Sequence, residues 1–437
     1  MENQSQLQVP HLEQPNRGTT WLKTYFNGLN SLLGVGILST PYALSQGGWL
    51  SLTLLIFVAM ACWYTGLLLQ RCLDQHPQIK SFPDIGNAAF GYIGRAIVAT
   101  FMYLELYLVA VEFLILGGDS LQHLFPNMNF TVGPLRIEGK TAFILPISLL
   151  ILPTTWLRSF GVLAYISASG VLCSLILISC VIWMGAVDGV GFHERGQLMK
   201  LGGLPASISL FNFCYSAHAV FPTLYNSMRD KSQFYKVLLF CFVTSTLEYG
   251  FMAIIGYLMF GDYSNSEVIL NLSMKKISTS ISIYTTVFIT VAKYPIIVAP
   301  IVIAIEDTLH SHKNRLVSIL IRTIIVLSTM LVAIFVPFFG YVMEFIGASS
   351  GVTLAWLLPC LCYLKINVGA QGHGLEFMVI VGIIVVGSII GIIGVYTSPS
   401  TMLTTKSHLH KKTKDEMCTD KPTCKINQAY IQNAVHA

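Results

Sequence analysis

Long apolar segments alternate with short polar ones along most of the chain. Apolar runs recur between residues 20 and 397, each about 18–25 residues long, which is the length that crosses a hydrocarbon core of roughly 30 Å as an α-helix. The runs are continuous rather than alternating, which favours helices over barrel strands. The sequence therefore predicts an all-α integral membrane protein with about eleven transmembrane helices, at residues 20–45, 48–70, 95–118, 141–157, 161–185, 203–227, 235–259, 280–304, 317–337, 339–364 and 375–397.

The composition supports the membrane prediction and excludes other classes. Hydrophobic residues make up 54% of the 437 residues and charged ones 11%, with a mean hydropathy of +0.66. A soluble domain carries roughly 25% charged residues, so this chain cannot cover a water-facing surface. The net charge of +5 comes from basic residues scattered over loops, which gives no nucleic-acid-binding face. The cysteines show no zinc-ligand spacing, so we expect neither a metal nor a cofactor.

The distribution of charge predicts the orientation. Residues 1–19 are polar, which predicts a cytosolic tail without a cleavable signal peptide. With that tail inside, the predicted cytosolic loops carry roughly twice as many Lys and Arg residues as the short outer loops, as the positive-inside rule requires. Two glycosylation sequons, at Asn129 and Asn271, both fall in predicted outer loops. Residues 398–437 are polar and predicted to be a disordered tail.

The first and sixth predicted helices are both interrupted midway. The interruptions lie in residues 30–41 (NSLLGVGILSTP) and 213–222 (FCYSAHAVFP), and each opens a block of five spans, residues 20–185 and 203–364. Because five is odd, the second block begins on the opposite side of the membrane, so the two blocks form an inverted repeat, with 375–397 as an extra helix. Paired interruptions of this kind indicate the central binding site of a transporter.

The residues of the first interruption suit a substrate carboxylate. Gly34 and Gly36 weaken the helix, and Pro41 lacks a backbone donor. Backbone N–H groups freed there need an acceptor, which a substrate carboxylate can supply beside the positive end of the following half-helix. The alternative is a packing face of small residues with a proline kink. The matching interruption in the sixth helix favours the binding site.

The sixth interruption adds polar side chains. Tyr215, Ser216 and His218 lie where we expect the chain to face a cavity. His218 could change its charge at an acidic luminal pH. It could equally be a structural histidine with satisfied hydrogen bonds.

The third predicted helix carries a row of carboxylates. Glu105, Glu112 and Asp119 are spaced by seven residues, which places them on one face with about 20° of drift per step. They climb roughly 21 Å, from mid-membrane to the outer mouth. Carboxylates inside a membrane are functional candidates because a charge in lipid is costly. The row suits proton uptake, with structural hydrogen bonding as the alternative and an interfacial position for Asp119.

One basic residue lies well inside a predicted helix. Lys293 is about halfway along the eighth span, at the same depth as Glu105 in the third. The two either compensate each other, or Lys293 supplies the fixed positive charge that sodium supplies in other transporters. Glu344, in the tenth span, is a further acid without an obvious partner in the sequence.

Several of these segments together resemble the vacuolar-type transporters of the amino acid/auxin permease family. They are residues 30–41, the run of acids in 105–119, CYSAHAVFP at 214–222, GYLMFG at 256–261, KYP at 293–295 and LPCLCYLK at 358–365. The resemblance covers roughly residues 19–397. It implies a LeuT-like fold of five plus five inverted helices with one extra, and proton-coupled movement of neutral amino acids, usually at a vacuolar membrane.

The resemblance also assigns residues. It implies that the substrate backbone is held at the two breaks, by Asn30, Gly34, Val35, Gly36, Ile37, Tyr215, Ser216, Ala217 and His218. Glu105, Glu112 and Lys293 match charged positions of the family and are assigned to proton coupling. Two residues depart from the family pattern: Ala217 stands where glycine is usual, and Glu344 where the family is usually uncharged.

The function predicted is secondary active transport by alternating access, with a neutral amino acid, protons and the lipid bilayer as partners. One alternative is a plasma-membrane importer of amino acids or of an auxin-like weak acid. Another is an amino-acid sensor with vestigial transport, although residues 1–19 form a short tail for signalling. An enzyme is not expected, since no nucleophile triad or metal-ligand cluster stands out in the sequence.

Overall fold

The structure is a computed structural model that describes residues 18–416, apart from 127, 129, 133–134, 138–139, 157–162, 274–275, 310–313, 337 and 368–373. Within those residues, eight helices are long and apolar enough to cross a membrane, and a shorter apolar helix covers 142–155. Apart from the broken spans, the helices are α3 (Ser51–Gln75), α4 (Phe82–Leu124), α5 (Lys140–Thr155), α6 (Leu163–Ala186), α9 (Phe234–Phe260), α10 (Ile277–Thr308), α11 (Arg315–Phe335) and α14 (Leu375–Glu416). The helix α4 is kinked at Gly91, whose φ of 65° is not helical.

The first and sixth spans are broken, as the sequence predicts. The first consists of α1 (Trp21–Leu32), the 3₁₀ turn η1 (Val35–Ser39) and α2 (Thr40–Gly47). The sixth consists of α7 (Leu204–Tyr215), the 3₁₀ turn η4 (His218–Val220) and α8 (Phe221–Ser227). Each second half-helix has a proline in its first turn, where the missing N–H leaves no hydrogen bond unmade.

The tenth span is also irregular. Between α12 (Phe339–Ile346) and α13 (Leu358–Ile366) the chain forms two π-helical stretches, η8 (Gly347–Gly351) and η9 (Thr353–Leu357). The wider π turns shift the backbone hydrogen bonds and free carbonyl groups for other partners. Sequence periodicity did not predict this.

The connections are short and carry little secondary structure. A hairpin of β1 (Phe130–Val132) and β2 (Leu135–Ile137) lies between α4 and α5. The 3₁₀ turns are η3 (Leu201–Gly203), η5 (Lys231–Gln233), η6 (Gly261–Tyr263) and η7 (Val268–Asn271). These elements do not change the all-α class of the protein.

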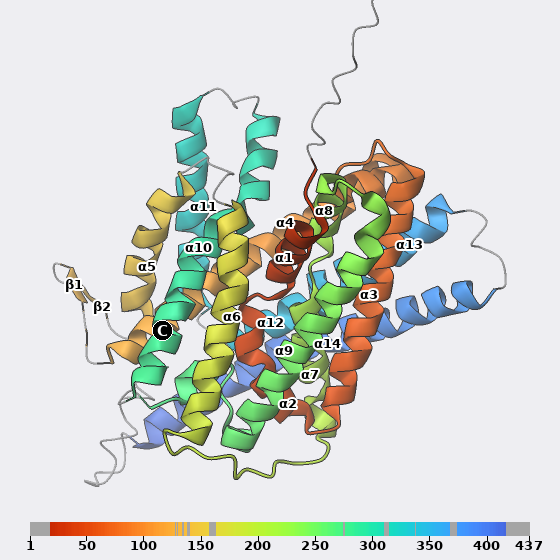
Figure 1. The fold of residues 1–437 in the computed structure, drawn as a ribbon. Helices are drawn as coiled ribbons and strands as arrows, with labels where there is room; N and C mark the ends of the chain where they lie inside the picture. Colours follow the sequence, from red (N-terminus) through yellow and green to blue (C-terminus); the bar gives the residue numbers. More distant parts are fainter. Residues whose placement is uncertain are drawn as a thin grey trace, which may run out of the picture.

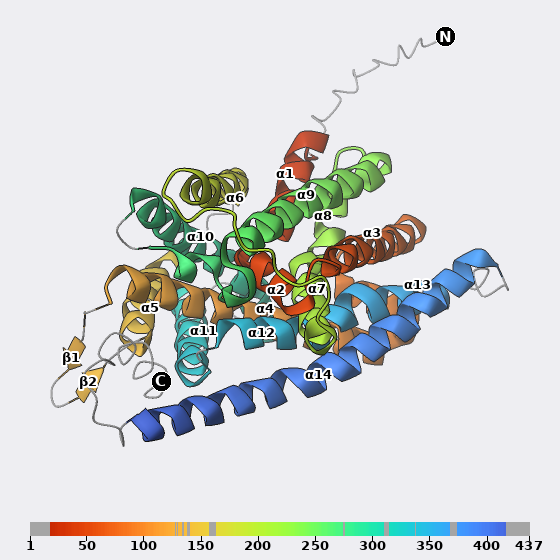
Figure 2. The same cartoon turned by 90° about the horizontal axis from the view of Figure 1, so that it is seen from below.

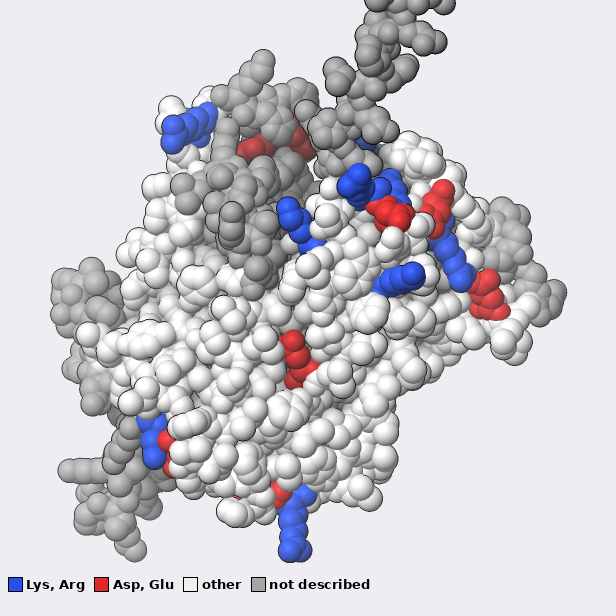
Figure 3. Space-filling view, in the orientation of Figure 1, with Lys and Arg blue, Asp and Glu red and all other residues white. Residues whose placement is uncertain are grey.

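The helices surround the two broken spans. The helix α4 packs against α10, α5 and α11, while α1 packs against α9 and α6 (Figure 1). Lys and Arg side chains gather towards the ends of the molecule in Figure 3, and the broad band between them is almost uncharged. This band matches the apolar interior of a bilayer.

The last helix lies on the outside of the bundle and is longer than predicted. Figure 2 shows α14 running across the molecule, where it contacts α7, α12 and α13. The helix ends at Glu416 rather than near residue 397, so the first part of the segment predicted to be disordered is helical. Extending an existing helix costs far less than starting one, which explains how polar residues can continue it. Residues 417–437 lie outside the described residues.

Candidate functional site at the helix breaks

The two helix breaks lie against each other. A Cβ atom placed on Gly36 would be 2.8 Å from the Cys214 sulfur, so the first break packs directly on the sixth span. The Tyr249 hydroxyl, from α9, reaches the carbonyl oxygens of Leu32 and of Cys214, the latter at 3.2 Å. Because these carbonyls end α1 and α7, one tyrosine connects both breaks. The two interruptions found in the sequence therefore form a single site.

The two glycines of the first break have different surroundings. A Cβ atom on Gly34 would meet only the Leu32 carbonyl oxygen, at 3.9 Å, whereas one on Gly36 would press into Cys214. Val35 and Ile37, on either side of Gly36, are buried. Of the two glycines, Gly34 is thus the one with free space beside it.

This contrast gives a prediction for two matched substitutions. Gly36→Ala should destabilise the protein by about 1–3 kcal/mol, because the added methyl overpacks the contact with Cys214. Gly34→Ala should leave the thermal stability close to that of the wild type, since its surroundings are open. Thermal unfolding of the detergent-solubilised variants measures both effects. Adding Cys214→Ala should restore stability to Gly36→Ala; equal melting temperatures for both single variants would contradict this packing.

The polar side chains of the sixth break point in different directions. The Tyr215 hydroxyl donates to the Thr246 oxygen of α9 at 2.8 Å, and its ring is fully buried. Ser216 instead donates to the Glu105 carboxylate of α4 at 2.5 Å. Among the side chains of this break, Ser216 connects it to the row of acids.

His218 faces α3. Its Nε2 atom lies 3.0 Å from the Thr65 hydroxyl and 3.1 Å from the Cys62 carbonyl oxygen, and the residue is 1% exposed. Its ring also packs on Phe221. These contacts match the structural alternative for His218, while its predicted substrate contact stays a prediction. Ala217, also buried, adds no polar group to the site.

The three carboxylates of α4 are all buried. Glu105, Glu112 and Asp119 are 6%, 0% and 9% exposed, so this face of α4 points into the bundle. Within the described part of the chain, neither oxygen of Glu112 has a hydrogen-bond partner. A buried carboxylate without a partner is costly when charged. The row can therefore hold protons inside the protein.

Lys293 contacts backbone rather than a carboxylate. Its Nζ atom donates to the carbonyl oxygens of Asn30, at 3.0 Å, and of Leu33, at 2.5 Å, and the residue is 7% exposed. These carbonyls lie at the C-terminal end of α1, the negative end of its dipole. Glu105 forms no ion pair with Lys293, so the first of the two interpretations of this lysine is wrong.

Asn30 brings a third helix to this point. Its side-chain oxygen is buried without a hydrogen-bond partner among the described residues, and a Cβ atom on Gly170 of α6 would collide with it. The same Cβ atom would lie 3.2 Å from the Lys293 side chain. Asn30 and Lys293 are thus packed tightly against α6.

Sequence reasoning missed two residues that hold the breaks in place. Tyr249, described above, lies in an apolar span that gave no signal. Asn212 donates from Nδ2 to the Gly347 carbonyl oxygen at 2.6 Å, and its Oδ1 accepts from the Trp356 indole at 2.7 Å. It therefore connects α7 to both π-helical stretches of the tenth span. A polar amide just before the sixth break was the signal that could have identified it.

The remaining predicted sites lie elsewhere. Glu344, in α12, is 3% exposed. The side chain of Asn271 is part of the folded connection between α9 and α10, where Nδ2 donates to the Tyr263 carbonyl oxygen and Oδ1 accepts from the Asn265 N–H, both at 2.8 Å. Asn129 lies outside the described residues. Glycosylation at both positions stays a prediction.

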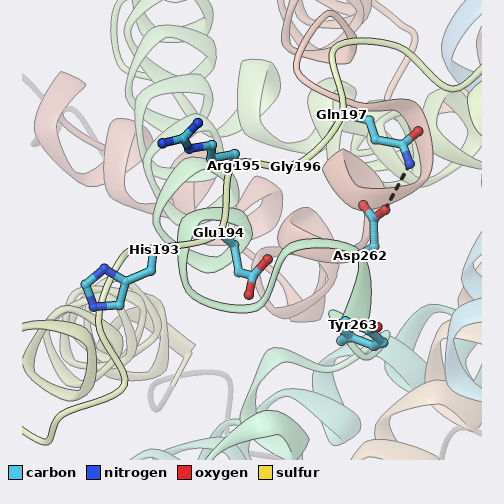
Figure 4. A pocket seen from close by; sticks show the side chains of 7 residues that line it. All are labelled: His193, Glu194, Arg195, Gly196, Gln197, Asp262 and Tyr263. Carbon is cyan, nitrogen blue, oxygen red and sulfur yellow. Dashed lines mark hydrogen bonds between the residues drawn. The ribbon is translucent and has the colours of Figure 1, made fainter.

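A separate polar cavity of about 450 Å³ opens between the loop that joins α6 to α7 and the turn that follows α9 (Figure 4). Asp262 lies on its wall, where it accepts from Gln197 at 3.3 Å and pairs with Lys200 at 2.6 Å. The lining residues are His193, Glu194, Arg195, Gly196, Gln197, Asp262 and Tyr263. None belongs to the breaks, so this cavity is not the site predicted from the sequence.

Comparisons with known proteins agree with the geometry. The family model described as "Transmembrane amino acid transporter protein" matches residues 17–400. The amino acid transporter AVT1I of Arabidopsis thaliana is 45% identical over 88% of this chain and 96% of its own length. The amino acid transporter AVT1J of the same plant is 44% identical over 87% of this chain and 91% of its own.

A solved structure supports the fold independently. A Na⁺-coupled sialic acid symporter, in a substrate-bound outward-open state, superimposes with a TM-score of 0.53. The match covers 86% of this chain and 89% of the symporter, at 13% sequence identity. It confirms the LeuT-like arrangement of the helices and carries no information on substrate.

Proposed function

This chain belongs to the transmembrane amino acid transporter family, and we propose that, within that family, it is a proton-coupled carrier of neutral amino acids. The protein is a multi-pass membrane transporter rather than an enzyme. Coupling to protons, preference for neutral substrates and the identity of the membrane are the parts that we add.

The hydrogen bond between Ser216 and Glu105 is the observation that carries the proposal. It joins a buried carboxylate of α4 to the unwound part of the sixth span at 2.5 Å. A carboxylate accepts this hydrogen bond well when it is charged and less well when it is protonated. Binding a proton at Glu105 therefore changes how firmly Ser216 is held, and with it the geometry of the substrate site. Glu112, without a hydrogen-bond partner among the described residues, would supply protons from farther out.

The charges of the site favour a neutral amino acid. Lys293 already donates to the Asn30 and Leu33 carbonyls, so its ammonium group is not free to pair with an acidic side chain of the substrate. The side chains of Val35, Ile37 and Ala217 are apolar and buried. We assign the substrate carboxylate to the N–H groups freed at the first break, beside Gly34. An apolar substrate side chain fits the remaining surroundings.

Lys293 would replace the cation of a sodium-coupled carrier. A positive charge beside the two carbonyls at the end of α1 stabilises the break without any bound ion. The chain can then use a proton as its coupling ion while keeping the same fold. This role extends the second interpretation of Lys293 drawn from the sequence.

We place the transporter at the vacuolar membrane, with the plasma membrane as the alternative. The support is the resemblance of residues 30–41 and 214–222 to vacuolar-type carriers. In either membrane the outer side of the protein would face an acidic compartment, so protons would enter along α4 from that side.

Uptake into proteoliposomes tests the proposed function. The purified protein is supplied with each of the twenty amino acids, with and without an imposed pH gradient. We expect a set of neutral amino acids to be taken up, and the gradient to raise their accumulation about tenfold. Transport that is insensitive to the gradient, or restricted to acidic or basic amino acids, would refute it.

A further inference from the structure

A carboxylate that the sequence analysis passed over lies in the middle of α9. Glu248 is about halfway along this helix and only partly buried. The helix α9 contacts α6 along this part of the bundle, and Figure 3 shows one acidic patch within the otherwise uncharged band of the face in view. A charge at this depth is costly and marks a functional position. None of the roles assigned above uses it.

The partner of Glu248 suits both states of a carboxyl group. The Ser174 hydroxyl of α6 lies 2.9 Å from a Glu248 oxygen and 2.8 Å from the Val171 carbonyl oxygen of its own helix. A serine hydroxyl has one hydrogen to donate and can also accept. It can donate to a charged Glu248, or turn to Val171 and accept from a protonated one. The hydrogen bond between α6 and α9 therefore survives either way.

The charged and titratable groups around Glu248 leave it without a counter-ion. Cys173 precedes Ser174 on α6, and the neighbouring Tyr249 of α9 is directed to the breaks. From α1, Tyr25 reaches α9 at Thr244, one helical turn before Glu248, with 2.9 Å between the two hydroxyl oxygens. The ammonium of Lys293 is occupied by carbonyl groups. In the described part of the chain, no basic side chain forms an ion pair with Glu248.

The position of α1 determines which side of the membrane Glu248 can reach. The helix α1 packs against both α6 and α9. With the N-terminus in the cytosol, as the sequence predicts, Thr244 and its contact with α1 lie on the cytosolic side of Glu248. The contact between Tyr25 and Thr244 places α1 beside α9 one helical turn before Glu248. If α1 separates from α6 and α9, this contact breaks and water can enter along the polar face formed by Thr244 and Glu248.

We propose that Glu248 is a second proton-binding site of this transporter, which exchanges its proton with the cytosol when α1 moves away from α6 and α9. An O–H bond forms at the carboxylate while an O–H bond of a cytosolic hydronium ion breaks and leaves water, and the reverse step returns the proton. Ser174 donates to Glu248 when the carboxylate is charged, and accepts from it when the carboxyl group is protonated. The inference rests on the proposed proton coupling and gives it a site that exchanges protons with the inner side, distinct from Glu105 and Glu112, which exchange protons with the outer side.

The test measures amino acid uptake by oriented proteoliposomes while the pH of each side is varied separately. Glu248→Gln keeps the shape and the contact with Ser174 but cannot take up a proton. Uptake is divided by counterflow in the same vesicles, which corrects for the amount of active protein. We expect the change of this ratio with cytosolic-side pH to be at least about tenfold smaller in Glu248→Gln than in the wild type. Ser174→Ala should shift the same pH profile. Ser179→Ala, a matched change at an exposed position of α6, should not.

The outcomes separate this inference from the proposed function. A wild-type protein that ignores pH on both sides refutes proton coupling itself. If uptake by the wild type depends on pH and Glu248→Gln shows the same dependence on cytosolic-side pH, only the inner site is refuted. If Glu248→Gln loses counterflow as well, labelling of the wild type by the lipid-soluble dicyclohexylcarbodiimide, read by mass spectrometry, decides. Labelling of Glu248 that falls as cytosolic-side pH rises supports the site, and pH-independent or absent labelling contradicts it.

Discussion

Lys293→Met should reduce amino acid uptake about a hundredfold. The methionine has a similar length but cannot donate, so the Asn30 and Leu33 carbonyls at the end of α1 lose the partner that lies 3.0 and 2.5 Å away. The two carbonyls left unpaired, one of them buried and the other partly buried, cost about 3 kcal/mol, which corresponds to a factor of about a hundred in a conformational equilibrium. Counterflow in proteoliposomes measures the loss without any need for a proton gradient.

A lysine outside the site provides the control. Lys276 pairs with Asp188 at 3.6 Å, with a side chain that is 43% exposed, and Lys276→Met should leave uptake near the wild-type level. Lys293→Arg should not restore transport, because the side chain of Lys293 is packed against Gly170 and the larger guanidinium has no room. If Lys293→Met shows counterflow at the wild-type level, the break in the first span keeps its structure without the ammonium group, which would contradict this prediction.

Glu105→Gln should remove most of the dependence of uptake on outer pH. Protonation of Glu105 from the outer side is the proposed coupling step, so wild-type uptake should rise as the outer pH falls. The amide cannot take up a proton, so the rate of uptake by the variant should change little with outer pH. Under an imposed pH gradient, its uptake should be about tenfold or more below that of the wild type. Initial rates at several outer pH values measure this.

Two variants show whether the effect depends on the hydrogen bond to the sixth break. Ser216→Ala removes the donor 2.5 Å from Glu105 and should move the pH profile without flattening it, because the carboxyl group remains. Glu194→Gln, an equivalent change on an exposed outer loop, should leave the profile in place. A Glu105→Gln variant with the full pH response would exclude this carboxylate from coupling.

The fold was largely predictable because lipid imposes a strict length and polarity on each span. The breaks at 30–41 and 213–222 followed from glycine, proline and polar residues inside apolar runs. The π-helical stretches of the tenth span were not predictable in this way, because their contacts, such as that of Asn212 with Gly347, come from another helix. The length of α14 was underestimated for a similar reason, since hydropathy marks where lipid contact ends rather than where a helix ends.

The site was predictable in its location but not in its contacts. Spacing placed Glu105, Glu112 and Asp119 on one face, and the structure buries all three. Matching depths suggested that Glu105 and Lys293 pair, but depth along a helix says nothing about rotation around it. The partners of Ser216 and Lys293 depend on which helices are neighbours. A single sequence contains that information only weakly.

Proton flux evoked by the substrate tests the central claim most directly. Proteoliposomes loaded with a pH-sensitive dye are given a transported neutral amino acid, with no pH gradient imposed and the membrane potential clamped by valinomycin and potassium. We predict that the amino acid alone moves protons across the membrane of vesicles with the wild-type protein. Vesicles with Glu105→Gln and vesicles without protein should show no such movement. Amino acid uptake by the wild type without any change in internal pH would contradict it.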